Sequence, residues 1–397
     1  MATIPSIAMI PSGYKADKLY SVLPTTGIGD FTFARTSVAT RVNKSGLIEE
    51  VLTGIPRLDY SDGACPSLLL EPQRLQKIQY SEEFSGASWF KSGNAFVSDN
   101  FAISPDGNLN GSKFTFDGTT NATVNTTISV TNGVSYTFSV WLKNDNLSDP
   151  TKVWVGLSTT TQGEYVTVTN VWKRFIITST SNGTLEYPRV QTSEVGSVFA
   201  WGAQLEQGSY PTSYIKNEGT VAGITRAADS ATGSGDATVI NSTEGTLYFE
   251  GNAFSSTGSS GLISLNVGTT NLNNRVTIEL DGANVKARFA IGGTSLGIFN
   301  YATDITQVLK IAVKYKANDF ALWVNGTERV PLTSGNSFSA NTLSELDFNR
   351  GDGQEPFIGN TKDLRVYNTA LSDLEIETLS SWTSFTAMAN ALKYTII

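Results

Sequence analysis

The chain has 397 residues, a formal net charge of −8 and a pI of about 4.8, with 40% apolar and 16% charged residues. Its length predicts two or three domains, and its acidic balance argues against nucleic-acid binding, because an acidic surface repels phosphate. There is no histidine and one cysteine, Cys65, which excludes an internal disulfide and every triad or metal site that depends on histidine.

Residues 1–80 begin without the basic start and unbroken apolar run of a signal peptide, since Pro5 and Pro11 interrupt the apolar residues. No window of the sequence reaches the ~18 apolar residues of a membrane-spanning helix. We therefore expect synthesis in the cytoplasm and no insertion into a membrane. The segment is rich in turn residues around one small apolar run, Leu68 to Leu70, and we interpret it as an attachment or assembly arm.

Regular alternation of apolar and polar residues begins after residue 80. In VSYTFSVWLK the residues from Val134 to Leu142 alternate, with Trp141 opposite the apolar face, and KVWVGLS repeats the pattern around Trp154. Such alternation indicates strands, and WKRFIITST and SVFAWGAQLE continue the series at the spacing of a sandwich. We predict an antiparallel jelly roll for residues 81–217.

The stretch WGAQLEQGSYPTSYIKNEGTVAGITRAADS, from Trp201 to Ser230, ends this strand series and precedes another. Its acids, tyrosines and arginine could line a catalytic wall. Its many turn residues favour a joint between domains, and we predict a linker at residues 218–235.

A second alternating series follows, in GTLYFEG, RVTIELDG, LKIAVKYK and DFALWVNGTERV. Asn325-Gly326 predicts a tight hairpin, because both residues tolerate a positive φ. In LSDLEIETLSSW, Ser372 and Glu375 have the spacing of a capping box and predict one short helix. We predict a sandwich for residues 236–382, followed by a tail at residues 383–397.

Three patches resemble modular structural proteins of tailed bacteriophages. They are ARTSVATRVNKSGLIEEV with PRLDYSDGACPSLLLEPQR, WGAQLEQGSYPTSYI with TRAAD, and KIAVKYKANDFALWVNGTERV with LRVYNTALSDLEIETL. The third is similar to a concanavalin A-like or laminin-G-like lectin sandwich, and the segment before it to a carbohydrate-binding-module jelly roll. The resemblance implies an all-β virion component, such as a tail or head fibre, that contacts glycans. It implies no catalytic residues.

Three tryptophans are candidates for carbohydrate binding. Trp141, Trp154 and Trp323 each lie opposite the more continuous apolar face of their strands. A flat indole on an exposed face can stack on the apolar face of a sugar ring. The alternative is that a second layer or a neighbouring subunit covers these rings.

The carboxylates are weaker candidates, in their case for the catalytic acids of a glycan hydrolase. Asp373, Glu375 and Glu377 come nearest to the acid string of concanavalin-like glucanases, but their order differs and the capping box places them on a helix. The pair Glu345 and Asp347 lacks a third acid.

Calcium is the one cofactor that the sequence suggests. The segment DFNRGDGQEP offers side-chain oxygens from Asp347, Asn349, Asp352 and Glu355, although their spacing differs from that of an EF-hand loop. The alternative is an ordinary polar turn.

These features predict a non-enzymatic virion protein whose lectin-like domains bind host-surface or environmental glycans, with avidity supplied by copy number. The expected partners are glycans, other virion proteins and further copies of the chain. A homotrimer is predicted because the tail residues Leu392, Tyr394, Ile396 and Ile397 would be exposed in a monomer. The alternatives are a purely structural capsid decoration or tail connector, and a glycan hydrolase.

Overall fold

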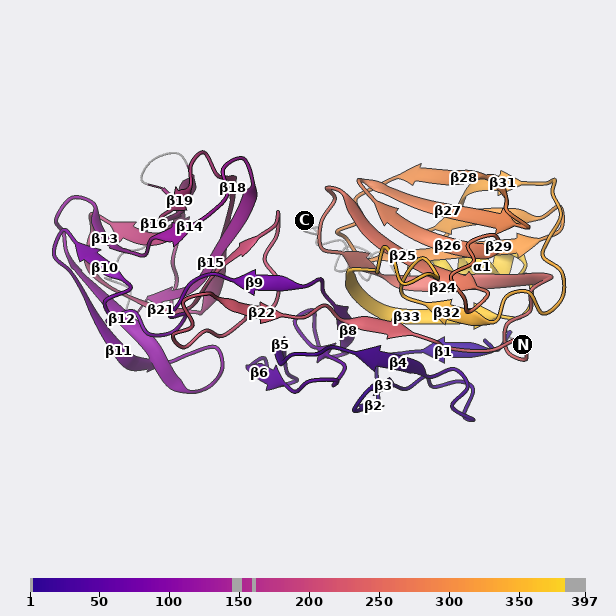
Figure 1. Ribbon diagram of the computed structural model, residues 1–397, viewed down its shortest axis with the longest axis horizontal. Helices are drawn as coiled ribbons and strands as arrows, with labels where there is room; N and C mark the ends of the chain where they lie inside the picture. The colour runs from indigo at the N-terminus through magenta and orange to yellow at the C-terminus, as the bar shows by residue number, and fades with distance from the viewer. Residues whose placement is uncertain (1–2, 145–151, 159–161, 383–397) are drawn as a thin grey trace. The chain divides into compact units, whose positions relative to one another are not determined.

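The computed structural model describes residues 3–144, 152–158 and 162–382 (Figure 1). These residues form many strands and, within those ranges, one helix, α1 (Asp373–Ser380). The prediction of an all-β chain with a short C-terminal helix is therefore confirmed. None of the described segments forms a helix long and apolar enough to cross a membrane. The tail residues on which the trimer prediction rests lie outside the described residues.

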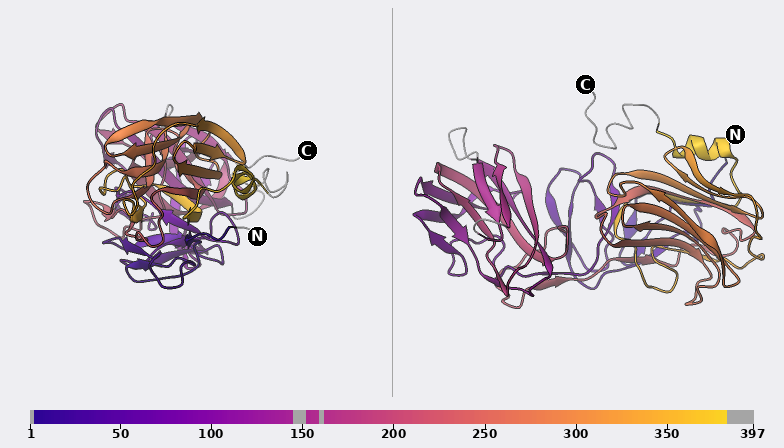
Figure 2. Two further views of the ribbon diagram at one scale, coloured as in Figure 1. Left: turned by 90° about the vertical axis from the view of Figure 1, so that its right-hand side faces the viewer. Right: turned by 90° about the horizontal axis from the view of Figure 1, so that it is seen from above.

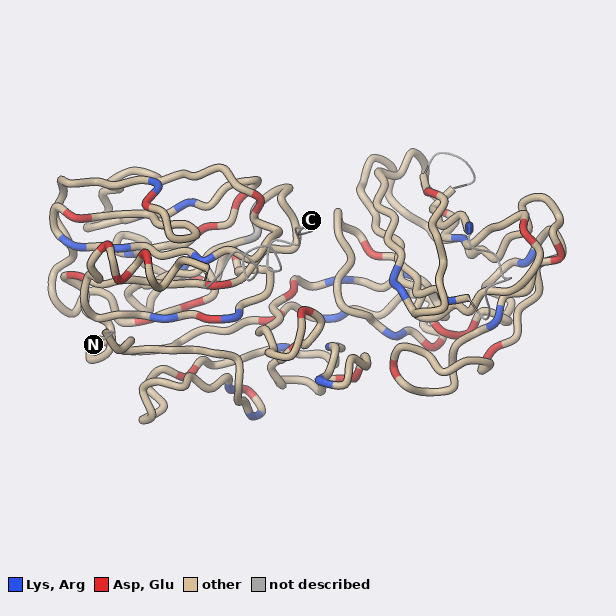
Figure 3. Tube along the Cα trace, turned by 180° about the vertical axis from the view of Figure 1, so that it is seen from behind, with Lys and Arg blue, Asp and Glu red and all other residues tan. Residues whose placement is uncertain are grey.

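The chain folds into two compact units that alternate along the sequence. Unit 1 comprises residues 1–36, 52–72 and 228–397, and unit 2 comprises residues 37–51 and 73–227. Lysine, arginine, aspartate and glutamate are interspersed along the trace of each unit (Figure 3). The acidic excess of the chain is thus not gathered in one block.

Unit 1 is a sandwich of two antiparallel sheets (Figure 2). The larger sheet has the order β31-β30-β29-β24-β33-β8-β7, with β1 also paired to β33. Its strands are β1 (Ile7–Met9), β7 (Leu58–Asp59), β8 (Ser67–Leu70), β24 (Glu244–Ala253), β29 (Leu309–Lys316), β30 (Phe320–Val324), β31 (Thr327–Leu332) and β33 (Gly359–Tyr367). The facing sheet consists, in spatial order, of β28 (Thr294–Ala302), β27 (Asn284–Ile291), β26 (Arg275–Asp281), β25 (Ser259–Asn266) and β32 (Glu345–Asp347).

Alternating apolar residues from both sheets form the core of unit 1. Ile278 of β26 and Ile311 of β29 belong to one buried cluster. Between β30 and β31, Asn325 and Gly326 have φ angles of 51° and 76°, so the predicted hairpin is confirmed. Ser372 accepts the Glu375 N–H, and the Glu375 carboxylate accepts the Ser372 N–H, which confirms the predicted capping box at α1.

Residues 1–80, interpreted from the sequence as an attachment or assembly arm, do not form a separate element in the structure. Strands β1 and β8 both pair with β33, with Ile7 opposite Val366 and Leu70 opposite Gly359. A separate four-stranded sheet of unit 1 contains β2 (Tyr14–Lys15), β3 (Lys18–Leu19), β4 (Phe31–Ala34) and β23 (Ser230–Thr232). The sequence suggests an arm because these strands are short and contain few apolar residues each. Their pairing partners, for β1 and β4, lie about 200 to 360 residues further along the chain, so the pairing is not visible in the local pattern.

Unit 2 is a second sandwich and matches the predicted jelly roll in its two antiparallel five-stranded sheets. The first consists, in spatial order, of β10 (Phe90–Ser92), β13 (Ala122–Asn125), β20 (Arg189–Thr192), β16 (Lys152–Gly156) and β17 (Gly163–Thr167). The second consists of β11 (Ala95–Ile103), β12 (Leu109–Asp117), β21 (Val195–Gln207), β15 (Ser135–Asn144) and β18 (Lys173–Thr180). Strand pairs complete the unit: β5 (Ala39–Val42) with β6 (Ile48–Val51), β9 (Arg74–Gln76) with β22 (Ile224–Arg226), and β14 (Ile128–Ser129) with β19 (Leu185–Glu186).

The predicted linker at residues 218–235 contains two strands and is not a free connection. Strand β22 pairs with β9 inside unit 2, and β23 pairs with β4 inside unit 1. The chain passes from unit 2 to unit 1 between residues 227 and 228. The turn-rich composition correctly indicated a boundary but not its paired strands.

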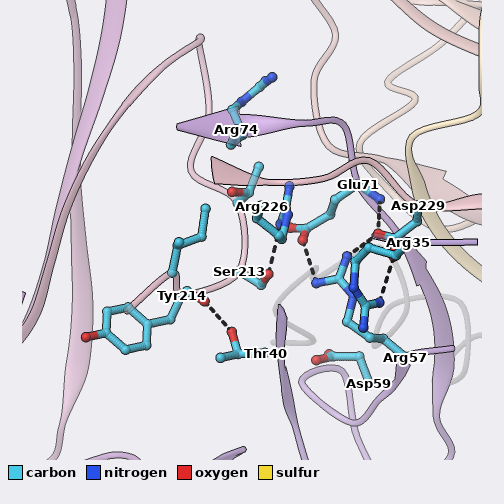
Figure 4. Close-up of polar contacts among 12 residues, drawn as sticks. Arg35, Thr40, Arg57, Asp59, Glu71, Arg74, Ser213, Tyr214, Arg226 and Asp229 are labelled. Carbon is cyan, nitrogen blue, oxygen red and sulfur yellow. Dashed lines mark hydrogen bonds and ion pairs between the residues drawn. The ribbon is translucent and has the colours of Figure 1, made fainter. Parts of the chain in front are cut away.

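A buried ion-pair network lies in unit 1 beside the four points at which the chain leaves or re-enters this unit. It consists of Arg35, Arg57, Glu71 and Asp229 (Figure 4). Arg35 Nη1 lies 3.0 Å from Asp229 Oδ1, Arg57 Nη1 lies 2.7 Å from Glu71 Oε2, and Arg57 Nη2 also pairs with Asp229. Three of the four side chains are fully buried and that of Glu71 is 3% exposed. The network joins segments that are up to 194 residues apart.

Candidate functional site

The outward side of the first sheet of unit 2 carries aromatic and polar side chains. Val153, Val155 and Val190 point into the core, so their neighbours along β16 and β20 point outward. We call this outward set the aromatic face. It comprises Phe90, Asn125, Lys152, Trp154, Tyr165, Tyr187, Arg189 and Gln191.

Trp154 and Tyr165 form an open corner on this face. They are directly opposite on β16 and β17, with ring centroids 5.3 Å apart and ring planes at 73°. The indole lies against Gly156 and Gly163, where an added Cβ would come within 2.7 and 2.8 Å of ring atoms. Its Nε1 donates to the Ser158 carbonyl at 3.2 Å. The half-buried indole is thus a fixed floor, and the phenol ring, 55% exposed, is a wall.

Polar groups with fixed orientations adjoin this corner. Gln191 lies opposite Trp154 on β20, and its amide accepts from Thr123 at 3.2 Å and donates to Asn121 at 2.9 Å. The ammonium of Lys152 lies 4.9 Å from the centroid of the Tyr165 ring. Flat apolar surface beside a few oriented polar groups is the composition of a small-molecule or sugar site.

Trp141, the second predicted sugar-binding tryptophan, is covered by its own surroundings. The guanidinium carbon of Arg174 lies 4.4 Å from the centroid of its ring. Trp201 and Tyr214 meet it edge-on, with centroids 5.2 and 5.8 Å away. Arg174 is held there by the Thr212 carbonyl at 2.7 Å. The ring face that a sugar would need is therefore occupied by a cation within the same unit.

Trp323, the third predicted tryptophan, is 6% exposed. It packs in a small cluster with Tyr248, Tyr367 and Ile376 of α1. The helix thus supplies the second layer on the outer side of the larger sheet of unit 1. The prediction of an exposed stacking indole at this position is wrong, because alternation tells which side of the strand the ring takes but not what covers that side.

The four residues expected to hold Ca²⁺ do not converge on a common point. Asp347 accepts the Gly233 N–H at 2.7 Å, and Asn349 Oδ1 accepts the Gly351 N–H at 2.6 Å. Asp352 and Glu355 both pair with Arg350, each at 2.6 Å. In the described part of the chain no group of three or more acidic, histidine or cysteine side chains could hold a metal ion. The polar-turn alternative fits these contacts, with Arg350 supplying the positive charge.

Asp347 has an acidic neighbour, Glu345, on the same side of β32. Asp347 is 3% exposed and accepts the Asn266 side-chain N–H at 2.8 Å. Burial, the charge of Asp347 and a hydrogen bond to it raise the pKa of Glu345 from 4.5 to about 7. The pair therefore holds a proton near neutral pH.

The stability of unit 1 is expected to fall as the pH rises from about 5 to about 8. Because the folded-state pKa of Glu345 is raised, its stabilising effect is fully present below pH 4.5 and is lost as the pH passes through about 7. The carboxyl is partly solvated, so we expect a fall in melting temperature of ~2–4 °C, corresponding to about 1 kcal/mol. Melting curves of the wild type and of Glu345→Gln, recorded between pH 5 and pH 8, test this expected fall in melting temperature. Glu377→Gln, on the exposed side of α1, is the control, and an unchanged pH profile for Glu345→Gln would contradict the expectation.

A polar hollow of about 430 Å³ in unit 2 is lined by Glu82, Asp99, Asn110, Lys216 and other polar residues. Burial raises the pKa of Glu82. Its carboxylate accepts from Tyr214 at 2.8 Å and from Asn110 at 3.0 Å. Asp99 accepts the Phe84 N–H at 3.0 Å and the Ser112 hydroxyl at 2.6 Å. These carboxylates hold loops together, so we place the candidate site on the aromatic face.

Sequence analysis found Trp154 but missed its partners on the face. Tyr165, Arg189 and Gln191 lie 11, 35 and 37 positions further along the chain, and strand register brings them to Trp154. One local feature of the sequence could have indicated that Trp154 lies in a site. Gly156 and Gly163 are small residues on either side of the hairpin, in positions where a bulky neighbouring ring needs room.

No protein-family model matches this chain, and no curated protein matches it. Solved structures with partial likeness include the carbohydrate-binding module CBM40 of the Ruminococcus gnavus IT-sialidase, solved with α2,3-sialyllactose. It has 19% identity and a TM-score of 0.32, over 36% of this chain and 86% of that one.

Two further structures are similarly distant. Domain 4 of AbnA, a GH43 extracellular arabinanase from Geobacillus stearothermophilus in complex with arabinotriose, has 15% identity and a TM-score of 0.32, over 39% of this chain and 73% of that one. The heptameric SAP-like pentraxin of Limulus polyphemus has 13% identity and a TM-score of 0.30, over 37% and 73%. At these identities and scores we infer the function from the site's own geometry.

Proposed function

We propose that this protein is a non-enzymatic glycan-binding protein and that the aromatic face of unit 2 is its binding site. The observation that carries the proposal is the corner of Trp154 and Tyr165, in which the glycines at positions 156 and 163 let the indole approach the sheet closely. A sugar ring presents apolar C–H groups on its faces and hydroxyls around its edge. It would stack on the indole while its hydroxyls meet exposed polar groups such as Lys152.

A binding role without catalysis agrees with the positions of the acids. Glu375 serves as the cap of α1, and Asp373 receives the Lys314 ammonium at 2.8 Å. A hydrolase of glycosidic bonds needs two acids facing each other across the sugar. Two of the acids considered for that reaction, Asp373 and Glu375, therefore already have structural roles.

The sequence resemblance to tailed-phage structural proteins supports a place for this glycan-binding protein on a virion, as a tail or head fibre or similar appendage. In that setting many copies would act together, so weak binding at each site would suffice for attachment. The purely structural alternative, a capsid decoration or connector, predicts no glycan binding by the aromatic face.

Replacing Trp154 with alanine is expected to weaken glycan binding at least ~20-fold, on the order of 2 kcal/mol, because the stacking floor is lost. A glycan array identifies a ligand for the wild type, and calorimetry then compares the variants. Phe96→Ala is the matched control, since Phe96 is 64% exposed on β11 of the other sheet. Equal affinities for Trp154→Ala and Phe96→Ala, or no ligand at all on the array, would contradict the proposal.

A further inference from the structure

Arg189 is a buried cation on the aromatic face that faces no carboxylate among the described residues. It is 8% exposed. Its Nε donates to the Tyr187 carbonyl at 3.2 Å, and its guanidinium carbon lies 5.9 Å from the centroid of the Tyr187 ring. Burial lowers its pKa, and the Tyr187 side chain opposes this effect. Burying a cation without an anion is unfavourable, so this arrangement suits a site that receives an anion from outside.

The two other deeply buried arginines already described show the contrast. Arg35 and Arg57 are fully buried in unit 1, and each is paired with a carboxylate of the same unit. Such pairing is the usual condition for burying a guanidinium in a protein. Within the described ranges, the contacts of Arg189 are a backbone carbonyl and a ring, which leaves most of its five N–H donors for a ligand.

The position of Arg189 places this cation beside the aromatic corner. On the sheet it is directly opposite Gly156, the residue over which the Trp154 indole lies. The indole reaches toward Ser158, beyond Gly156, and Arg189 leans back toward Tyr187, whose N–H donates to the neighbouring Leu157 carbonyl. Both side chains thus turn toward the same end of the sheet. Lys152, on the other side of Trp154 along β16, adds a second positive charge to the face.

We propose that the glycan recognised by the aromatic face contains an acidic sugar, whose carboxylate binds the guanidinium of Arg189 while its ring stacks on Trp154. This inference rests on the proposed glycan-binding function and specifies its ligand class. A planar guanidinium binds a carboxylate through two parallel N–H···O bonds, which fixes the orientation of the sugar as well as its position. The acidic chain, with a net charge of −8, would otherwise repel such a ligand, so a local cation is needed for its binding.

The test measures the affinity of the full chain for uronate oligosaccharides and for their methyl esters. The esters have the same sugar backbone without the negative charge. We expect the wild type to bind the acid about 10- to 100-fold more tightly than the ester, and Arg189→Gln to bind both as weakly as the wild type binds the ester. Arg189→Lys should regain part of the preference, and raising the salt concentration should reduce it in the wild type. A sulfated oligosaccharide, included in parallel, distinguishes a carboxylate site from a general anion site.

The outcomes separate this inference from the proposed function. If the wild type binds acid and ester equally and Trp154→Ala abolishes both, the glycan-binding proposal stands and the acidic-sugar inference is wrong. The same conclusion follows if Arg189→Gln keeps the preference for the acid, or if the sulfated probe binds more tightly than the uronate. If none of these oligosaccharides binds while another glycan from the array does, the acidic-sugar inference is wrong and the glycan-binding proposal stands. The melting temperature of Arg189→Gln should not fall, because the substitution removes an unpaired buried charge.

Discussion

Replacing Asp229 with asparagine is expected to lower the free energy of unfolding of unit 1 by about 3–5 kcal/mol, the usual cost of leaving a buried charge without its partner. Asp229 Oδ1 binds Arg35 at 3.0 Å, while Oδ2 binds Arg57 and accepts the Glu71 N–H at 2.9 Å. Burial alone would lower the pKa of Arg57, but Asp229 and Glu71 raise it above its ordinary value. The variant would leave two buried cations facing one carboxylate.

Chemical denaturation of the full chain measures this effect, with Asp281→Asn as the control. Asp281 forms an ion pair with Lys286 in the same unit, but its side chain is 40% exposed, so its loss should cost less than ~1 kcal/mol. The double variant Arg35→Met with Asp229→Met removes one charge of each sign. It should be more stable than Asp229→Met alone if charge imbalance causes the damage. Similar losses for Asp229→Asn and Asp281→Asn would refute the role given to the network.

The residues of the network lie in two of the three sequence patches quoted above. Arg35 lies in ARTSVATRV, Arg57 and Glu71 lie in PRLDYSDGACPSLLLEPQR, and Asp229 ends TRAAD. Each residue lies within six positions of a point where the chain passes between units 1 and 2. These two patches therefore contribute buried ion pairs to the stability of unit 1. The glycan-binding face draws its residues from other segments.

Local sequence patterns predicted individual strands and the helix, whereas pairing between distant segments decided which side chains are exposed. Alternation in VSYTFSVWLK gave β15, and Ser372 with Glu375 gave the start of α1, because both depend on residues close in sequence. Whether each tryptophan ring is covered or exposed depends on segments that are distant in the sequence. Arg174 covers Trp141 and α1 covers Trp323, whereas Trp154 lies beside two glycines and retains an open corner.

The site could be predicted only in part for the same reason. A tryptophan opposite an apolar face is visible in the sequence, but the cation that selects the ligand is not. Arg189 follows a proline in YPRVQT, where nothing local distinguishes it from an exposed arginine. Its burial and its place opposite Gly156 come from the pairing of β16 with β20, which is set by the packing of Val155 and Val190 in the core.

A chain that begins at residue 81 is expected to be insoluble or to lack the cooperative unfolding transition of unit 1, contrary to the separate arm that composition suggested. Residues 1–72 contribute eight buried side chains to the core of unit 1: Ile7, Met9, Leu19, Phe31, Phe33, Leu58, Leu68 and Leu70. At ~1.5–3 kcal/mol each, their combined loss is comparable to or larger than the 5–15 kcal/mol by which whole domains are stable. The truncation would also expose one edge of β33 and remove both arginine partners of Asp229.

Single substitutions in the full chain test the same conclusion without a truncation. Phe31→Ala should lower the free energy of unfolding by about 3–5 kcal/mol, because Phe31 is fully buried and its ring packs against Phe348 with centroids 5.3 Å apart. Val22→Ala, in the same segment but at a side chain that is 47% exposed, should change it by less than ~0.5 kcal/mol. Soluble, cooperatively folding protein from residue 81 onward, together with equal stabilities of these two variants, would restore the arm as a separate element. If instead the truncated chain does not fold and Phe31→Ala is much less stable than Val22→Ala, unit 1 does not fold without residues 1–72. These residues then cannot be exchanged or removed as an attachment module.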